Sequence, residues 1–517
     1  MSFPRPERVS PLPLSAVVGV IGDDMARLVH GDAATRVTGV SLDTHTVRPG
    51  DLWAALPGAR AHGADFVDKS VTAGAVAVLT DPEGAARIRS KGVALPLVET
   101  ARPRDVLGRV AAAIYDSAAA RPTMFGITGT NGKTTIAYLT VSALQALGRT
   151  PGLISTIETR IGSERIRSVR TTPETTDLHA LLSVMGERGV EDCVMEVSSH
   201  ALSLHRVDEV VYDVALFSNL SQDHLDFHGS MEEYFLAKAS LFTPQRARHA
   251  LVCIDDVWGQ RVAREATIPV TTLTSRLDVD ADWVVGGDPR EPQMSLTHAD
   301  QVLHLQSALP GDFNRVNTAM AAVALITAGL PPQSVAEAIL TRPEVPGRME
   351  LVHPSDPAQR DLQGLPLAVV DFAHTPDAVG AALSALRPQT NGLLVVVLGA
   401  GGSRDPGKRP GMGAAAAAHA DVVIVTDDNP REEDPARIRE AVAEGVWPRS
   451  RASLEMIEGR TAAIERAVEL AHASGPGATV AVLGKGHEQG QEIRGEVRDH
   501  DDRAVLRAAL DRRSATP

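Results

Sequence analysis

The chain has 517 residues and a formal net charge of −14, and 43% of its residues are hydrophobic. This length predicts two to four domains with sizeable apolar cores. Only 3% of the residues are aromatic, so the cores are expected to consist of Ala, Val and Leu, which suits helices packed on buried parallel strands. The acidic balance and the lack of a long basic run argue against nucleic acid as a partner.

The two cysteines, Cys193 and Cys253, lie inside apolar runs and form no CxxC pair. They are therefore predicted to be core residues of a protein in a reducing compartment. The N-terminus is rich in proline and lacks the apolar segment of a signal peptide. No uninterrupted apolar stretch reaches about 18 residues, so no membrane span is expected. We expect a cytoplasmic, monomeric enzyme.

The first 120 residues contain short apolar runs such as 75–80, and the stretch 117–123 is predicted to be a linker. Residues 124–148 then have the pattern of a strand, a glycine loop and a helix. Ile136, Leu139, Ala143 and Leu147 would share one face of that helix, and Gly148 suits its C-terminal cap.

Further strands are predicted at 193–197, 213–218 and 250–254, with helical stretches among them. This alternation is typical of a parallel sheet with helices on both faces. A break rich in Pro, Gly and charge follows at 341–364. Afterwards the alternation restarts, with strands predicted at 367–372, 393–402, 421–426 and 479–484. The prediction is three α/β domains, at 1–120, 121–345 and 346–517.

The stretch GITGTNGKTT (126–135) is the strongest local signal. Gly126, Gly129 and Gly132 would let the backbone fold tightly around an anion. Lys133 could then reach the β- and γ-phosphates of a nucleotide, and the Thr134 hydroxyl could bind Mg²⁺. The strict P-loop spacing fails, because Gly126 lies one residue too far from Gly132. A plain glycine-rich turn before a helix is the alternative.

The stretch TDDNPREEDP (426–435) places one arginine on a turn stiffened by proline, just after a predicted strand. Asp428, Asn429, Pro430 and Arg431 form its centre. The alternative to a functional role is an exposed turn with a charged rim, in which Glu432 to Asp434 are the solvated start of a helix.

The glycine loop resembles the ATP loop of the Mur ligases and of their folylpolyglutamate synthetase relatives, which join an amino acid to a carboxylate at the expense of ATP. The loop alone does not separate the two groups. CVMEVSSHALSLHRV (193–207) and SNLSQDHLDFHG (218–229) resemble two further Mur ligase segments. The fold implied has a UDP-binding domain, a central P-loop domain and a C-terminal Rossmann-like domain.

The resemblance implies roles for individual residues around the nucleotide. Catalytic roles fall to Lys133, Lys238, Arg348 and His224. The implied ATP contacts are Gly129, Thr130, Asn131, Gly132, Lys133, Thr134, Thr135, Asn314, Asn317 and Asp371. The implied Mg²⁺ ligands are Thr134, Glu196, His224 and Lys238, the last as a carbamate formed from a neutral lysine and CO₂. Without the resemblance, Lys238 would be an ordinary helical lysine, and Asn314 and Asn317 could equally be helix caps.

The stretch 39–66 resembles the UDP-binding segment of the family. The implied contacts to a UDP-muramyl dipeptide are Leu42, Thr44, Ala59, Arg60, Ala61, Thr171, Thr172, Ser198 and Arg206. The chain departs from the family at His45, where arginine is usual, and at Arg170, where asparagine is common.

DNPR (428–431) matches the motif with which some family members select diaminopimelate. The implied contacts are Arg404, Asp428, Asn429, Pro430, Arg431, Gly484 and Glu488. Arg431 would pair with the distal carboxylate through two hydrogen bonds. Lysine, which lacks that carboxylate, would leave Arg431 buried without a counter-ion and would be rejected.

The reaction implied is an ATP-dependent ligation for peptidoglycan synthesis. ATP would convert the D-glutamate carboxylate of UDP-N-acetylmuramoyl-L-alanyl-D-glutamate to an acyl phosphate, which the amine of meso-diaminopimelate would attack. Two rival functions remain. A folylpolyglutamate synthetase has no reason for the UDP-like first domain or for DNPR, and a nucleotide-binding regulatory module would need only the loop.

Overall fold

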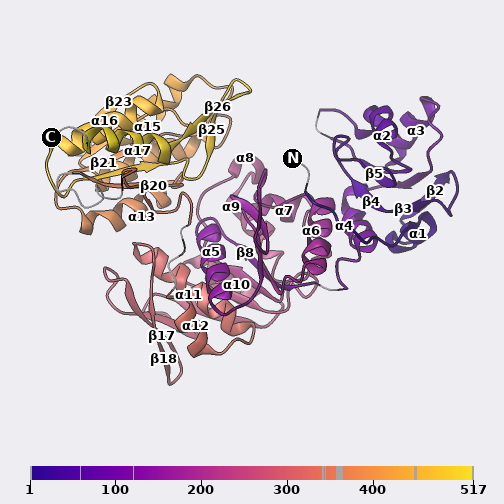
Figure 1. The fold of residues 1–517 in the computed structure, drawn as a ribbon, viewed down its shortest axis with the longest axis horizontal. Helices are drawn as coiled ribbons and strands as arrows, with labels where there is room; N and C mark the ends of the chain where they lie inside the picture. Colours follow the sequence, from indigo (N-terminus) through magenta and orange to yellow (C-terminus); the bar gives the residue numbers. More distant parts are fainter. Residues whose placement is uncertain are drawn as a thin grey trace.

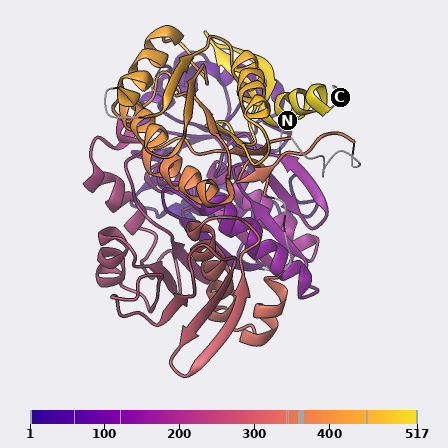
Figure 2. The same ribbon diagram turned by 90° about the vertical axis from the view of Figure 1, so that its left-hand side faces the viewer.

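The computed structural model describes residues 3–58, 60–119, 121–340, 343, 345–356, 365–447 and 451–514. These residues form three α/β units, with the central unit between the other two (Figure 1). Figure 2 looks onto the third unit from its outer side. The predicted α/β class is therefore confirmed. The exact domain boundaries near 120 and 346 stay a prediction.

The first unit contains a five-stranded sheet in the order β2-β7-β6-β5-β4. All neighbours in it are parallel except β2 and β7. Its helices cover both faces, since one apolar cluster includes residues of α1 and α4 and another includes residues of α2 and α3. The elements are β1 (Leu12–Pro13), α1 (Leu14–Ile21), β2 (Ala26–His30), β3 (Arg36–Val37), β4 (Gly39–Ser41), β5 (Asp51–Ala55), α2 (Val67–Ala73), β6 (Ala77–Thr80), α3 (Pro82–Ser90), β7 (Leu97–Thr100) and α4 (Pro103–Tyr115).

The central unit is built on an eleven-stranded sheet in the order β11-β10-β9-β12-β8-β13-β14-β15-β16-β17-β18. Its strands are β8 (Thr123–Thr128), β9 (Pro151–Ile154), β10 (Glu158–Ile161), β11 (Glu164–Arg167), β12 (Asp192–Glu196), β13 (Val214–Phe217), β14 (Ala250–Cys253), β15 (Val270–Thr274), β16 (Trp283–Gly286), β17 (Gln293–His298) and β18 (Gln301–Gln306). The seven neighbouring strands β9, β12, β8, β13, β14, β15 and β16 are mutually parallel, as predicted. The antiparallel strands at both edges were not predicted.

The helices of the central unit are α5 (Lys133–Ala146), α6 (Thr175–Glu187), α7 (Ser199–Ser203), α8 (Leu225–His228), α9 (Met231–Ala239), α10 (Val257–Glu265), α11 (Asp312–Thr327) and α12 (Pro332–Ala338). Helix α5 follows the glycine loop and is buried on nearly every side, because it lies between the sheet and helices α11 and α12. The sequence predicted one apolar face for this helix, whereas the structure buries more of its surface than that one face. Gly148 has φ of 76° just beyond its end, as a C-terminal cap requires.

The third unit has a six-stranded sheet in the order β19-β20-β24-β21-β22-β23, in which only β19 is antiparallel to its neighbour. Its helices lie on both faces of the sheet. The elements are β19 (Glu350–Leu351), β20 (Leu367–Asp371), α13 (Pro376–Leu386), β21 (Leu394–Leu398), α14 (Arg409–His419), β22 (Val422–Val425), α15 (Pro435–Val446), β23 (Ser453–Met456), α16 (Arg460–Ala473), β24 (Thr479–Leu483), β25 (Gln489–Ile493), β26 (Glu496–Asp501) and α17 (Asp502–Ser514).

The two larger sheets position the candidate site by the same rule. In an open parallel sheet, ligands bind beyond the carboxyl ends of the strands. Glu196 ends β12 and the glycine loop follows β8, while Asp371 ends β20.

Cys193 and Cys253 are buried and free, as predicted. Across the described ranges, none of the helices combines the length and apolar character needed to cross a bilayer.

Candidate active site

The glycine loop between β8 and α5 is held by the segment that follows β13. Thr130 N donates to Asn219 O at 2.9 Å, and Asn131 N donates to Asn219 Oδ1 at 2.9 Å. Ser218 Oγ donates to Asn131 O at 2.6 Å. The loop conformation is therefore fixed before any ligand arrives.

Two of the three predicted glycines are needed in this loop. Gly129 has φ of 142°, and a Cβ there would lie 2.0 Å from Ser218 Oγ. Gly132 has φ of 90°, and a Cβ there would lie 2.5 Å from Asn317 Oδ1. Gly126 is different, because it lies within β8, where a Cβ would meet the Tyr212 ring at 2.6 Å. The expected loop role of Gly126 is wrong, and this glycine serves strand packing instead.

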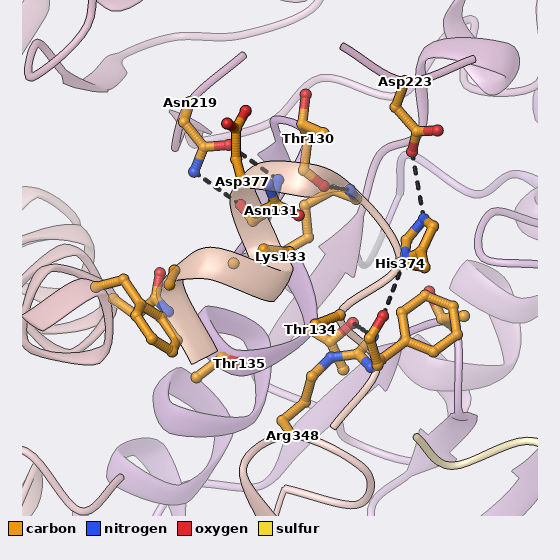
Figure 3. A pocket seen from close by; sticks show the side chains of 18 of the residues that line it. Thr130, Asn131, Lys133, Thr134, Thr135, Asn219, Asp223, Arg348, His374 and Asp377 are labelled. Carbon is orange, nitrogen blue, oxygen red and sulfur yellow. Dashed lines mark hydrogen bonds and ion pairs between the residues drawn. The ribbon is translucent and has the colours of Figure 1, made fainter. Parts of the chain in front are cut away.

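A cavity of about 390 Å³ lies between the central and third units. Its walls come from the glycine loop, the end of β12, helices α9 and α11, and the start of the third unit (Figure 3). The predicted residues that line it are Thr130, Asn131, Gly132, Lys133, Thr134, Thr135, Thr171, Glu196, Ser198, His224, Lys238, Asn314, Asn317, Arg348 and Asp371. The structure thus gathers most of the predicted nucleotide and metal residues around one space.

Two lysines meet beneath the loop. Lys133 Nζ and Lys238 Nζ each donate to Gly129 O at 2.8 Å. The Lys238 side chain is only 1% exposed, so it is not a surface lysine. Burial, with the nearby charge of Lys133, lowers the pKa of Lys238 well below its ordinary value. A neutral amine is the form that reacts with CO₂, so this environment suits the predicted carbamate.

Arg348 connects the start of the third unit to the glycine loop. Its Nη2 donates to Thr134 Oγ1 at 3.1 Å (Figure 3). Its guanidinium lies over the Phe372 ring, 4.4 Å from the ring centroid. Asp371 accepts hydrogen bonds from Met349 N at 2.7 Å and Ala373 N at 2.8 Å. Asp371 therefore shapes the turn beside Arg348 as well as facing the cavity where a ribose contact was predicted.

Asp223 is a residue that sequence reasoning missed. Its carboxylate lies 3.4 Å from His374 Nε2 (Figure 3). It also lies 3.2 Å from Lys408 Nζ, and both partners belong to the third unit. Burial alone would raise the pKa of Asp223, but the hydrogen bond and charge of His374, with the charge of Lys408, hold it well below its usual range. The sequence did hold a signal for Asp223, because this residue directly precedes His224 in the segment 218–229, which resembles a Mur ligase segment.

His224 lines the cavity but stays partly open to water, with 40% of its side chain exposed. Its φ of 56° turns the chain sharply into α8. Partial burial lowers the pKa of His224, which favours the neutral imidazole that a metal needs.

No cluster of three His, Cys, Asp or Glu side chains among the described residues could hold a metal. The predicted ligand set contains only two such residues, with a hydroxyl and a lysine carbamate completing it.

The two asparagines of α11 do not cap it. The helix begins at Asp312 with Gly311 as its N-cap, so the capping alternative is wrong. Asn314 Nδ2 donates to Pro310 O at 2.8 Å, and Asn317 Nδ2 donates to Asn314 Oδ1 at 3.0 Å. Both side chains face the cavity. The contact with adenine stays a prediction.

The residues predicted for the UDP-muramyl dipeptide lie partly outside the cavity. Leu42 packs against the core of the first unit, Arg60 and Ala61 are exposed, and Ala59 lies outside the described residues. Thr172 is buried, and its hydroxyl donates to Glu196 O at 2.9 Å. Thr44 is partly buried. Thr171 and Ser198 line the cavity beside the nucleotide loop, whereas Leu42, Thr44, Arg60, Ala61, Thr172 and Arg206 are not among its lining residues.

Arg206 belongs to a charged cluster where the first and central units meet. Glu174 lies 3.0 Å from Arg206 Nε, 2.8 Å from Arg170 Nη1 and 3.3 Å from Arg104 Nη1. One carboxylate thus faces three guanidinium groups, and Asp43 and Asp177 also interact electrostatically with Arg170. His45 pairs with Asp43 at 2.8 Å.

The predicted diaminopimelate residues of the DNPR turn cluster around a buried lysine that sequence reasoning missed. Lys485 is fully buried, and its Nζ donates to Asn429 Oδ1 at 2.9 Å and to Glu488 Oε2 at 3.1 Å. A Cβ on Gly484 would lie 2.7 Å from Asp428 Oδ2. The turn and the 484–488 segment are therefore tied together, outside the nucleotide cavity.

The side chains of Arg431 and Arg404, both predicted to bind diaminopimelate, lie beside Gly401. A Cβ on Gly401 would lie 3.0 Å from Arg431 Nη1 and 3.9 Å from Arg404 Cγ. The expectation that Arg431 is buried and has no counter-ion of its own is wrong. It already has a counter-ion, Glu492, at 3.0 Å, and its side chain is 22% exposed. Glu433 is also more than a solvated helix start, because it pairs with Arg409 at 2.9 Å.

Three family descriptions match the chain. They are "Mur ligase family, catalytic domain" at residues 36–115, "Mur ligase middle domain" at 127–325 and "Mur ligase, glutamate ligase domain" at 347–486. Together with the fold and the loop, they place the chain in the Mur ligase family.

Curated relatives show which members of the family this chain is similar to. Proteins from Streptomyces coelicolor and Streptomyces avermitilis, both named UDP-N-acetylmuramoyl-L-alanyl-D-glutamate--2,6-diaminopimelate ligase, are 48% and 49% identical, each covering 98% of both chains. A solved structure of a ligase with this name aligns with a TM-score of 0.65 at 28% identity, over 98% of this chain and 100% of that one. A MurF ligase from Thermotoga maritima in complex with ADP shares the fold, with a TM-score of 0.63 at 19% identity over 92% of this chain and 99% of that one.

Proposed function

We propose that this Mur ligase family member adds meso-2,6-diaminopimelate to the D-glutamate carboxylate of UDP-N-acetylmuramoyl-L-alanyl-D-glutamate, with ATP as co-substrate. The observation that carries the proposal is the similarity of nearly the whole chain to ligases of that name at 48–49% identity. A folylpolyglutamate synthetase is disfavoured, because the similarity extends through the first unit and the DNPR turn. We place the reaction in the cytoplasm, where ATP is supplied.

The first chemical step is transfer of the γ-phosphoryl group of ATP to the glutamate carboxylate. The glutamate oxygen forms a bond to phosphorus, and ADP leaves. Lys133 and Arg348 border the same cavity and can stabilise the charge that builds on the phosphoryl oxygens. The Arg348 bond to Thr134 shows that the arginine of the third unit can reach the loop.

The second step is attack of the diaminopimelate amine on the acyl phosphate. The carbonyl carbon becomes tetrahedral, then expels phosphate, and the amine loses a proton as the amide forms. Lys485 and Asn429 orient Glu488 toward the distal ammonium, and Arg431 and Arg404 receive carboxylates. These contacts hold the amino acid by its far end and leave its reacting amine free.

Mg²⁺ is the implied cofactor, and the residues present fit it. Thr134 and Glu196 offer a hydroxyl and a carboxylate at one cavity, which suits a hard cation. His224 and a carbamate on Lys238 would complete the set. The metal would neutralise phosphate charge when bound.

Phosphate release tests the proposal against its rivals. With ATP and Mg²⁺ present, we expect release only when both UDP-N-acetylmuramoyl-L-alanyl-D-glutamate and meso-diaminopimelate are added. Lys133→Ala should remove it. Release with a folate and glutamate instead would favour the synthetase, and no release with any acceptor would favour a binding module.

A further inference from the structure

Backbone contacts place Glu492 beside the Arg431 side chain. Arg431 N donates to Glu492 O at 3.0 Å, and Arg494 N donates to Arg431 O at 2.9 Å. Glu492 N in turn donates to Asn429 Oδ1 at 3.0 Å. The β25–β26 hairpin is therefore docked on the DNPR turn, and the two side chains meet because their main chains are fixed.

The side chains form an ion pair that is open to water. Arg431 Nε lies 3.0 Å from Glu492 Oε2, and Arg431 Nη1 donates to Gly402 O at 2.7 Å. The Arg431 side chain is 22% exposed and the Glu492 side chain 43% exposed. Because pairs this exposed are weakly held, a carboxylate with better geometry can replace Glu492 on the guanidinium.

We propose that Glu492 is a specificity-determining residue. It occupies the carboxylate subsite on Arg431 until the distal carboxylate of the amino acid displaces it. This inference rests on the proposed function, and specifically on Arg431 as the receptor of that carboxylate. It assigns to Glu492 the role of an internal competitor, attached to the hairpin.

The competitor affects the two amino acids in opposite ways. Diaminopimelate must displace Glu492 before it can pair with Arg431, so the carboxylate of Glu492 lowers its affinity. Lysine brings no distal carboxylate, and Glu492 then continues to neutralise Arg431. Glu492 thereby removes much of the penalty of an unpaired arginine, which is the penalty that would otherwise reject lysine.

Glu492→Gln is the decisive variant, because it keeps the size of the side chain and the backbone bond to Asn429. We expect kcat/KM for meso-diaminopimelate to rise and that for L-lysine to fall, so that their ratio increases about tenfold. Glu492→Ala should shift the ratio in the same direction. Glu496→Gln, on the same hairpin and paired only distantly with Arg498 at 3.9 Å, is the matched control and should leave the ratio unchanged.

The Arg431→Ala background separates the possible failures. There Glu492→Gln should no longer change the ratio. If Arg431→Ala lowers the ratio but neither Glu492 variant raises it in the wild-type background, the competitor role is wrong and the proposed function stands. If Arg431→Ala leaves the preference for diaminopimelate intact, the carboxylate receptor lies elsewhere, and both the inference and that part of the proposed function are wrong.

Discussion

Lys238 resembles an ordinary helical lysine in the sequence, but its environment in the fold is different. Its amine is buried, shares Gly129 O with Lys133 and has a lowered pKa. We expect Lys238→Ala to reduce ligation by about 10²–10³-fold, because a charge-stabilising oxygen ligand is lost.

Added formate or acetate should restore part of the activity of Lys238→Ala, since either can supply the missing carboxylate oxygens. Steady-state phosphate release measures both effects. Lys408→Ala, which removes an amine without removing a carbamate site, should gain nothing from these anions. An active Lys238→Ala enzyme would show that no carbamate is needed.

Asp177 gives a residue-scale prediction about pH. Burial raises the pKa of Asp177 to about 6, and this rise is only partly offset by Arg5. An aspartate whose folded pKa lies above its unfolded value contributes stability that is lost as pH rises from about 4 to 6. Asp177→Asn should therefore stabilise the protein by about 3 kcal/mol at pH 7.5, with no gain below pH 4. Urea unfolding at both pH values measures this, and an equal effect at each would contradict it.

At the scale of elements, Arg460 joins the two segments that carry the proposed amino-acid site. This fully buried residue at the start of α16 donates to Leu483 O at 2.9 Å and to Asp427 O at 3.3 Å, and it pairs with Asp502 of α17 at 2.7 Å. Arg460→Met should destabilise the third unit by about 3 kcal/mol, because buried Asp502 loses its guanidinium partner and His500, at 2.8 Å, replaces only part of that charge.

Arg466→Met on the same helix is the control for Arg460. Its ion pair with Glu455 is about one-third exposed, so a loss below about 1 kcal/mol is expected. Adding Asp502→Asn to Arg460→Met should recover part of the lost stability in urea unfolding. Equal losses for Arg460→Met and Arg466→Met would mean that the buried pair has no special role.

At the scale of the whole molecule, Asp223 connects two units through His374 and Lys408. Gln222 Nε2 adds a hydrogen bond to Asp405 at 3.1 Å. We expect Asp223→Asn to weaken the contact between the central and third units and to increase the radius of gyration in small-angle X-ray scattering. Glu232→Gln, which affects an exposed pair within the central unit, should leave the radius unchanged. An unchanged radius for Asp223→Asn would show that other contacts hold the units together.

The sequence by itself determined the main parallel strands and the glycine loop, but not the antiparallel strands at the edges of the central sheet. Val-rich and Ala-rich runs between helical stretches are sufficient to predict buried parallel strands, because only such strands are apolar on both faces. The loop residues Gly129, Gly132 and Lys133 were identifiable because their backbone and charge requirements are met within a few neighbouring positions.

Only the tertiary structure decided which distant residues meet. The pairing of Arg431 with Glu492, of Lys485 with Asn429 and of Asp223 with Lys408 joins segments separated by 61, 56 and 185 positions. The strand role of Gly126 depended in the same way on the Tyr212 ring packed against it. Periodicity and motif spacing describe contacts along one segment, whereas ion pairs and burial depend on how separate segments pack, and so only the folded chain reveals them.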